Sequence, residues 1–331
     1  MFFFNLDNDV SMRNDFIKTE LHCHLEGAIP SKWLYTMGRQ NSLIDKNYSY
    51  EKFYQDMVLT APSESLKKVL SYFDLMGKFL ANRDILFEAT KEVCRFENIS
   101  GIRNLELRYA PLMLKKYADL SFDESYAVIS EAVMWAREKL KMNIGLIAIG
   151  ERNYSFDEIV SVLEWALDNE SKLIGVDLAN QEFDFEPKKY AAIFSQVHQT
   201  DLGITIHCSE SGFPEQVVET IKHIKPNRIG HGIAIVDSPD IIQLVREREI
   251  TLELCPISNW ITRCVSDPSK HPLKVFLDKG LRVTLNTDDP GLFDNSMPKE
   301  IAFNEKHLNL TRKDFVMLDT YATEASFLDL A

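Results

Sequence analysis

The chain has 331 residues, 45% hydrophobic and 26% charged, so it is long enough to bury a large core. Its 37 basic and 50 acidic side chains give a net charge of −13, which disfavours nucleic acid and anionic membranes as partners and leaves a small molecule as the expected ligand. Five cysteines without CxxC spacing, no signal-peptide pattern in Met1–Val10 and no apolar run long enough to span a bilayer lead us to expect a cytoplasmic protein without disulfides.

Short apolar runs recur along the chain and alternate with helical patterns. They predict strands at Thr19–His24, Asn104–Tyr109, Ile144–Gly150, Leu173–Leu178, Gly203–His207, Arg228–His231, Ile250–Cys255 and Leu281–Asn286. Strands that alternate with helices are typical of a parallel sheet, so we predict that residues 1–331 form a single (β/α)8 TIM barrel. An open doubly wound sheet is the alternative, but no GxGxxG turn supports it.

The segments between these runs carry helix signals. Ser155–Glu158 reads as a capping box, Ser238–Pro239 as a helix start, and Gly280 as the end of a helix that opens at His271–Pro272. Residues 41–100 lack a strand signal and are predicted to form a helical insertion after the first strand, with a possible role as a lid over the pocket.

Metal-binding side chains stand at the ends of several predicted strands. His22 and His24 are two residues apart on one strand, so both point to the same side. One such pair is weak evidence, but His207 and Asp288 also end predicted strands, and strand ends meet at one mouth of a barrel. Three histidines and one aspartate form a zinc-type ligand set.

Three further residues next to these ligands could supply acid–base chemistry. Glu210 could shuttle a proton, although a single loop glutamate is more often exposed. His231 could accept the proton of a metal-bound water or serve as a hydrogen-bonding neighbour of the ligands. Asp289 could bind a substrate ring nitrogen or lie in a solvated turn before Pro290. We expect the remaining histidines, His198, His223, His271 and His307, to be structural or exposed, and we assign no catalytic role to the cysteines.

The motifs together resemble the adenosine deaminase family of metal-dependent hydrolases. The supporting segments are His22–Gly27, Leu105–Pro111, Gly175–Ala179, His207–Glu210, Arg228–Gly232, Cys255–Asn259 and Asn286–Pro290. The resemblance implies a TIM barrel that binds one zinc ion per chain through His22, His24, His207 and Asp288. It also implies that Glu210 protonates N1 of a 6-aminopurine, that Asp289 binds N7, and that His231 and Asp288 orient the zinc-activated water that attacks C6.

The same resemblance implies a small-molecule purine nucleoside as substrate, in contact with His24, Glu26, Asn180 and Asp289. Three positions depart from the family pattern: Glu26 replaces an aspartate that resembles a ribose contact, Asn180 replaces a glycine, and Ser209 replaces a glycine in His-Ala-Gly-Glu. These changes concern the substrate more than the reaction. We expect adenosine or a close 5′-modified nucleoside, with adenine, N6-methyl-AMP and aminodeoxyfutalosine as alternatives.

Two other functions remain open at this point, and so does the oligomeric state. A two-metal hydrolase acting on an ester or amide would usually need a bridging carboxylated lysine or carboxylate, and no lysine ends a predicted strand. A non-catalytic nucleoside-binding homologue would have no need for Glu210.

Overall fold

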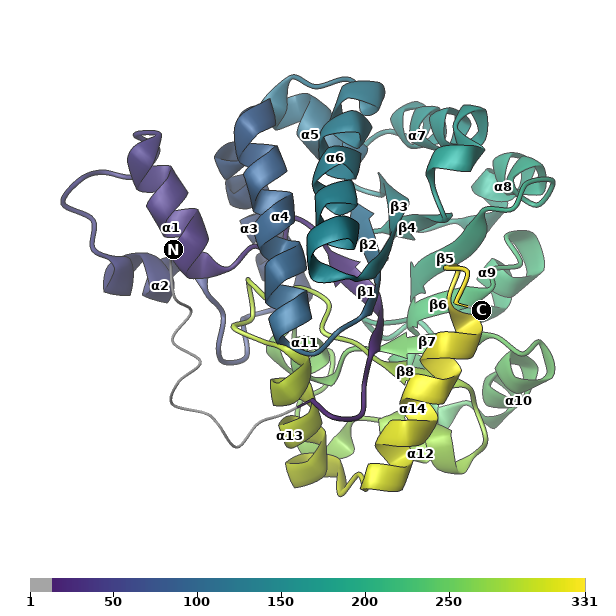
Figure 1. Cartoon of the computed structure of the whole chain (residues 1–331). Helices are drawn as coiled ribbons and strands as arrows, with labels where there is room; N and C mark the ends of the chain where they lie inside the picture. Colours follow the sequence, from purple (N-terminus) through teal and green to yellow (C-terminus); the bar gives the residue numbers. More distant parts are fainter. Residues whose placement is uncertain (1–13, 331) are drawn as a thin grey trace.

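The computed structural model describes residues 14–330 and shows a barrel of parallel strands surrounded by helices (Figure 1). The eight strands pair in sequential order, and a bridge between Cys23 and Asp288 joins the first strand to the segment after the last. They are β1 Thr19–His24, β2 Asn104–Tyr109, β3 Asn143–Glu151, β4 Gly175–Ala179, β5 Gly203–Cys208, β6 Arg228–His231, β7 Thr251–Leu254 and β8 Val283–Leu285. The predicted (β/α)8 barrel is confirmed, whereas the expectation about Met1–Val10 lies outside the described residues.

Every predicted strand coincides with an observed one, and all bounds agree within two residues. The agreement arises because both faces of a parallel barrel strand are covered, so that the strands read as apolar runs. The largest difference is at β8, where the predicted strand began at Leu281 and the observed strand begins at Val283. The Leu281 amide instead donates to the Phe276 carbonyl, which places Leu281 in the turn that ends the preceding helix.

The helices follow their local sequence signals. They are α1 Ser31–Gln40, α2 Tyr50–Met57, α3 Leu66–Phe79, α4 Arg83–Ile99, α5 Pro111–Ala118, α6 Phe122–Leu140, α7 Phe156–Asp168, α8 Ala191–Val197, α9 Glu215–His223, α10 Pro239–Glu247, α11 Pro256–Ile261, α12 Leu273–Asp278, α13 Met297–Leu308 and α14 Arg312–Ala325. The capping box at Ser155 is present, and Gly280 follows α12 with a φ of +74°. Within residues 14–330, no helix has both the length and the apolar character needed to cross a membrane.

Four helices, α1 to α4, separate β1 from β2, in keeping with the helical character predicted for residues 41–100. The side chains of Ser49, Ser65 and Asn82 each accept a backbone N–H at the start of the helix that follows. In Figure 1, α1 and α2 lie to one side, whereas α3 and α4 pack beside α5 and α6. This arrangement brings α3 to the mouth of the barrel.

The C-terminal segment closes the N-terminal end of the barrel. Gly175 and Gly203 leave space that the Phe327 ring fills, and a Cβ atom at Gly203 would lie 2.3 Å from that ring. The Arg228 guanidinium lies 3.6 Å from the ring centroid, and it donates a hydrogen bond to the Ala325 carbonyl. The Phe327 ring and Arg228 therefore fill this end of the barrel, opposite the end where the strands finish.

Glu97 on α4 makes the stability of the fold dependent on pH. It is fully buried, and within residues 14–330 neither carboxylate oxygen has a hydrogen-bond partner. Burial raises its pKa from 4.5 to about 8, so the folded protein retains a proton that the unfolded chain releases. The Glu97 contribution to the free energy of unfolding is therefore present at low pH and is lost as the pH rises through about 8.

We expect Glu97→Gln, which remains neutral, to lose this part of the pH dependence. At pH 8 its Tm should exceed that of the wild type by several degrees, at about 2–4 °C per kcal/mol, while at about pH 5 the two should be similar. Thermal unfolding followed by circular dichroism at both pH values tests this, with the exposed Glu305→Gln as the control. Equal Tm differences at the two pH values would contradict it.

Candidate active site

The structure brings His22, His24, His207 and Asp288 together at the C-terminal mouth of the barrel. All four are buried, and their ligand atoms converge. The Nε2 atom of His24 lies 3.3 Å from Nε2 of His22 and 3.2 Å from Nε2 of His207. Asp288 Oδ1 lies 3.2 Å from Nε2 of both His22 and His24.

The protonation of these histidines matches what a metal site requires. Nδ1 of His22 lies 2.8 Å from Glu253 Oε2, and Nδ1 of His207 lies 2.9 Å from Asp177 Oδ2. Because each Nδ1–H donates to a carboxylate, each Nε2 carries a lone pair directed at the other candidate ligands. Lone pairs held this close repel one another unless a cation lies between them.

The separations fit a divalent metal of zinc size. A tetrahedral site with metal–nitrogen distances of about 2.0–2.1 Å has edges of about 3.3 Å, close to the observed nitrogen–nitrogen distances. Four protein ligands fill a tetrahedral set, so a water molecule would bind as a fifth ligand, an expansion that zinc allows. The four residues could therefore hold one zinc ion.

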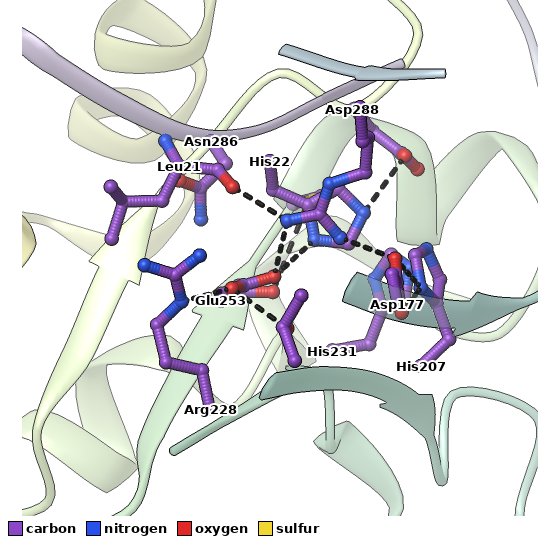
Figure 2. A network of polar contacts seen from close by, with 12 residues as sticks. Leu21, His22, Asp177, His207, Arg228, His231, Glu253, Asn286 and Asp288 are labelled. Atoms are coloured by element: carbon purple, nitrogen blue, oxygen red, sulfur yellow. Dashed lines mark hydrogen bonds and ion pairs between the residues drawn. The ribbon is translucent and has the colours of Figure 1, made fainter. Parts of the chain in front are cut away.

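Glu253 on β7 lies beneath the ligands and joins them to two buried arginines (Figure 2). Its Oε2 contacts Arg108 at 2.9 Å in addition to His22, and its Oε1 contacts Arg228 at 2.6 Å. Burial opposes ionisation, but the two arginines hold the pKa of Glu253 well below its usual range. Asp177 is held the same way: burial opposes its ionisation, but its contacts with His207 and Arg108 lower its pKa. Both carboxylates therefore stay charged and fix the orientation of the histidine rings.

Glu210 lies in the loop after β5 and lines the same pocket. It is buried, and its Oε1 accepts hydrogen bonds from Asn259 Nδ2 at 3.1 Å and Thr262 Oγ1 at 3.2 Å. Burial, followed by the charges of Glu182 and Asp288, raises its pKa to about 8. Glu182 also accepts the backbone N–H of Glu210, which holds the loop in place. Glu210 is therefore a proton-bearing carboxyl group at neutral pH.

Asp289 is a second carboxyl group of this pocket with a raised pKa. Burial and the neighbouring charge of Asp288 raise its pKa well above its usual range. Its Oδ1 has no partner within the described residues, and a Cβ atom at Gly27 would lie 1.8 Å from it. The absence of a side chain at Gly27 thus makes room for a carboxyl group that can bind a ligand.

The substrate-facing residues expected from the sequence all line one pocket. The lining includes His24, Glu26, Asn180, His207, Glu210, His231, Asp288 and Asp289. Glu26 is buried, accepts the backbone N–H of Ala110 at 2.9 Å, and has a pKa raised by burial to about 7. Glu151 also lines the pocket, and burial followed by the charge of Glu26 raises its pKa to about 8.

Several site residues adopt a left-handed backbone conformation. Asn180, Ser209, His231 and Asp288 have φ values of 76°, 56°, 63° and 64°. Such conformations cost energy for residues with a side chain and cluster at functional sites. Asn180 and Ser209 occupy the positions where the resemblance implies glycine, so the backbone keeps the glycine conformation there. The Ser209 hydroxyl donates to the Phe213 carbonyl at 2.7 Å, which compensates part of the cost.

The adenosine deaminase family model matches residues 17–331 of this chain. The chain belongs to the adenosine deaminase family. An adenosine deaminase from Plasmodium gallinaceum is 30% identical over 316 residues, which cover 94% of this chain and 86% of that protein. The chain is thus a hydrolytic deaminase of a metal-dependent family, as the resemblance implied, and purine deamination is its reaction type.

Solved structures show the same fold at lower identity. An adenine deaminase from Arthrobacter aurescens has a TM-score of 0.87 at 22% identity, with 94% of each chain covered. A zinc-bound amidohydrolase from Burkholderia ambifaria has a TM-score of 0.84 at 21% identity, covering 95% of this chain and 86% of that one. The N6-methyl-AMP deaminase of Arabidopsis has a TM-score of 0.81 at 23% identity, covering 94% and 93%.

Sequence reasoning missed the residues that support the site. Arg108 and Glu253 are charged residues inside otherwise apolar strands. Burying a charge costs free energy, so these two positions could have indicated a functional role. Asn259 and His271 carry no comparable signal. His271 was expected to be structural or exposed; the structure buries it, with Nε2 3.1 Å from Asn259 Oδ1.

Asp177 offers a test of the histidine orientation. In Asp177→Asn, an amide that faces His207 Nδ1 can donate instead of accept, which favours the wrong tautomer for metal binding. We expect zinc affinity to fall about 10–100-fold. Competition with a chromophoric chelator measures this, with the exposed Asp168→Asn as the matched control. Unchanged zinc affinity in Asp177→Asn would contradict the assignment.

Proposed function

We propose that the protein is a zinc-dependent hydrolase that converts a 6-aminopurine nucleoside, adenosine or a close 5′-modified analogue, to the 6-oxopurine and ammonia. The observation that carries this proposal is that two carboxyl groups with raised pKa values, Glu210 and Asp289, share one pocket with three of the candidate metal ligands, His24, His207 and Asp288. Protein carboxyl groups are usually ionised at neutral pH and can then only accept hydrogen bonds. Neutral ones suit ring nitrogens, which are acceptors.

The residues would have separate roles in metal binding, proton donation and hydrogen bonding. His22, His24, His207 and Asp288 would hold one zinc ion per chain, which when bound would make a water molecule nucleophilic at neutral pH. Glu210 would donate its proton to N1 and so make C6 more electrophilic, because its raised pKa keeps the proton available. Asp289 would donate a hydrogen bond to N7, and His231 would hydrogen-bond the attacking oxygen.

The charge of the pocket supports an uncharged nucleoside over a nucleotide. Six carboxyl-bearing residues line it, and no lysine or arginine is among its described lining residues; the six are Glu26, Glu151, Glu182, Glu210, Asp288 and Asp289. A phosphate would find no positively charged partner among these lining residues, and a charge buried without a counterion is costly. The adjoining outer pocket has the exposed cations Lys67, Arg263 and Lys270 among its lining residues.

Apolar side chains favour 5′-methylthioadenosine as a second candidate. Leu66, Val69, Leu70 and Phe73 of α3 line the pocket together with Met113. A methylthio group would find apolar contacts there.

The same contacts support the proposal that residues 41–100 include a lid, because α3 would be held closed by a bound nucleoside. Slower amide hydrogen exchange in α3 when a nucleoside analogue is bound would be the expected sign.

A substrate panel tests the proposed specificity. Ammonia release should be fastest with adenosine, 2′-deoxyadenosine or 5′-methylthioadenosine, and kcat/KM for AMP and N6-methyl-AMP should be at least about 100-fold lower, or about 3 kcal/mol. Adenine and aminodeoxyfutalosine complete the panel. Faster turnover of a nucleotide, or of free adenine, would contradict the substrate assignment while leaving the reaction type intact.

Glu210→Gln tests the proposed role of Glu210 as the proton donor to N1. Because the amide cannot transfer a proton to N1, kcat should fall about 10²–10⁴-fold while bound zinc is unchanged. Zinc content by mass spectrometry and Tm are measured alongside, and the exposed Glu305→Gln on α13 should behave as the wild type. Full activity in Glu210→Gln would rule out the mechanism.

A further inference from the structure

Asn259 connects the two acid–base residues of the pocket to a third group behind them. It is fully buried on α11, directly after β7. Its Nδ2 lies 3.1 Å from Glu210 Oε1 and 3.2 Å from His231 Nδ1, and its Oδ1 lies 3.1 Å from His271 Nε2. One amide group therefore contacts two residues of the site and one that lies outside it.

The backbone N–H of Leu273, which contacts His271, fixes the direction of these hydrogen bonds. The backbone N–H of Leu273 donates to Nδ1 of His271 at 3.3 Å. A backbone N–H can only donate, so His271 Nδ1 must carry a lone pair and its proton must be on Nε2. Burial also lowers the pKa of His271 to about 3, in keeping with a neutral ring. His271 Nε2–H therefore donates to Asn259 Oδ1.

The orientation of the Asn259 amide then determines the tautomer of His231. Since Oδ1 accepts from His271, the two Nδ2 hydrogens of Asn259 point at Glu210 and His231. His231 Nδ1 must accept and thus carries a lone pair, which leaves the proton of the neutral ring on Nε2. His231 Nε2 lies 3.7 Å from Glu210 Oε2, on the side where both residues line the pocket.

We propose that Leu273, His271 and Asn259 form a one-way hydrogen-bond relay that fixes His231 as the Nε2–H tautomer. His231 then presents a hydrogen-bond donor to the attacking oxygen and has no lone pair on Nε2 with which to take up a proton. Asn259 and His271 are positioning residues in this account. The catalytic consequence rests on the proposed function, whereas the tautomer does not.

The relay narrows the role expected for His231 from the sequence. The sequence left two roles open for His231: it could accept a proton from the attacking water, or it could serve as a hydrogen-bonding neighbour. A neutral ring with Nε2–H can do only the second on its pocket side. The relay also gives Glu210 a fixed donor on Oε1, which leaves Oε2 to carry its proton.

The tautomer can be observed directly in the full-length protein labelled with ¹⁵N-histidine, with and without zinc. Long-range ¹H–¹⁵N correlation spectra distinguish the two neutral tautomers, and His231→Gln identifies the His231 signals. We expect a protonated Nε2 and a bare Nδ1 in the wild type. In Asn259→Asp the carboxylate can only accept from His231 Nδ1, so the pattern should reverse.

Two substitutions of His271 provide matched variants. In His271→Gln the side chain can accept from Leu273 and donate to Asn259, so the wild-type His231 pattern should persist. In His271→Phe the direction of the relay is lost, and both His231 tautomers should appear. Tm and zinc content of each variant establish that it is folded and able to bind metal.

Activity provides the second readout. We expect kcat in Asn259→Asp to fall at least about 100-fold, since a wrong histidine tautomer can cost as much as about 10⁴-fold elsewhere. KM should change little, and His271→Gln should retain most activity. An Nδ1–H signal for His231 in the wild type, or an unchanged pattern in folded Asn259→Asp, would overturn the relay. Absence of turnover with the expected tautomers would instead overturn only the proposed function.

Discussion

The rest of the site depends on the hydrogen bonds that two buried carboxylates accept from histidine Nδ1 atoms. Glu253 orients His22 and Asp177 orients His207, at 2.8 and 2.9 Å. These contacts direct the Nε2 lone pairs to one point and make the position unfavourable unless a cation is bound. The carboxylates themselves stay ionised only because Arg108 and Arg228 are buried beside them. The barrel provides the framework, since the six residues come from six different strands that meet only when it closes.

Above this charged layer, the pocket has the opposite electrostatic character. Within residues 14–330, no buried arginine or lysine forms an ion pair with Glu210, Asp289, Glu26 or Glu151, and burial raises the pKa of each of these carboxyl groups. The same residue type therefore serves as a fixed anion below the ligands and as a proton carrier above them. This separation matches what attack on a 6-aminopurine requires, because the ring nitrogens need donors while the metal needs anionic and lone-pair ligands.

Much of this architecture could be predicted from the sequence, and the limits have a physical cause. Strands such as β1 and β5 are readable because burial on both faces makes them apolar, and His22 and His24 are readable because alternate residues share a face. The partners of Asn259 lie 49, 28 and 12 residues away, and Arg108 meets Glu253 across 145 residues. Such contacts leave no local pattern. Glu151 was missed for the same reason, since it shares the pocket with Glu26 although the two residues lie far apart in the sequence.

The central claim is that one zinc ion, held by His22, His24, His207 and Asp288, is needed for deamination. The most direct test is a titration of the metal-free protein with zinc while the conversion of adenosine to inosine is followed by absorbance. The account predicts no activity without metal and a linear rise that stops at one equivalent per chain. Activity in the metal-free protein, or a rise that continues to two equivalents, would contradict it.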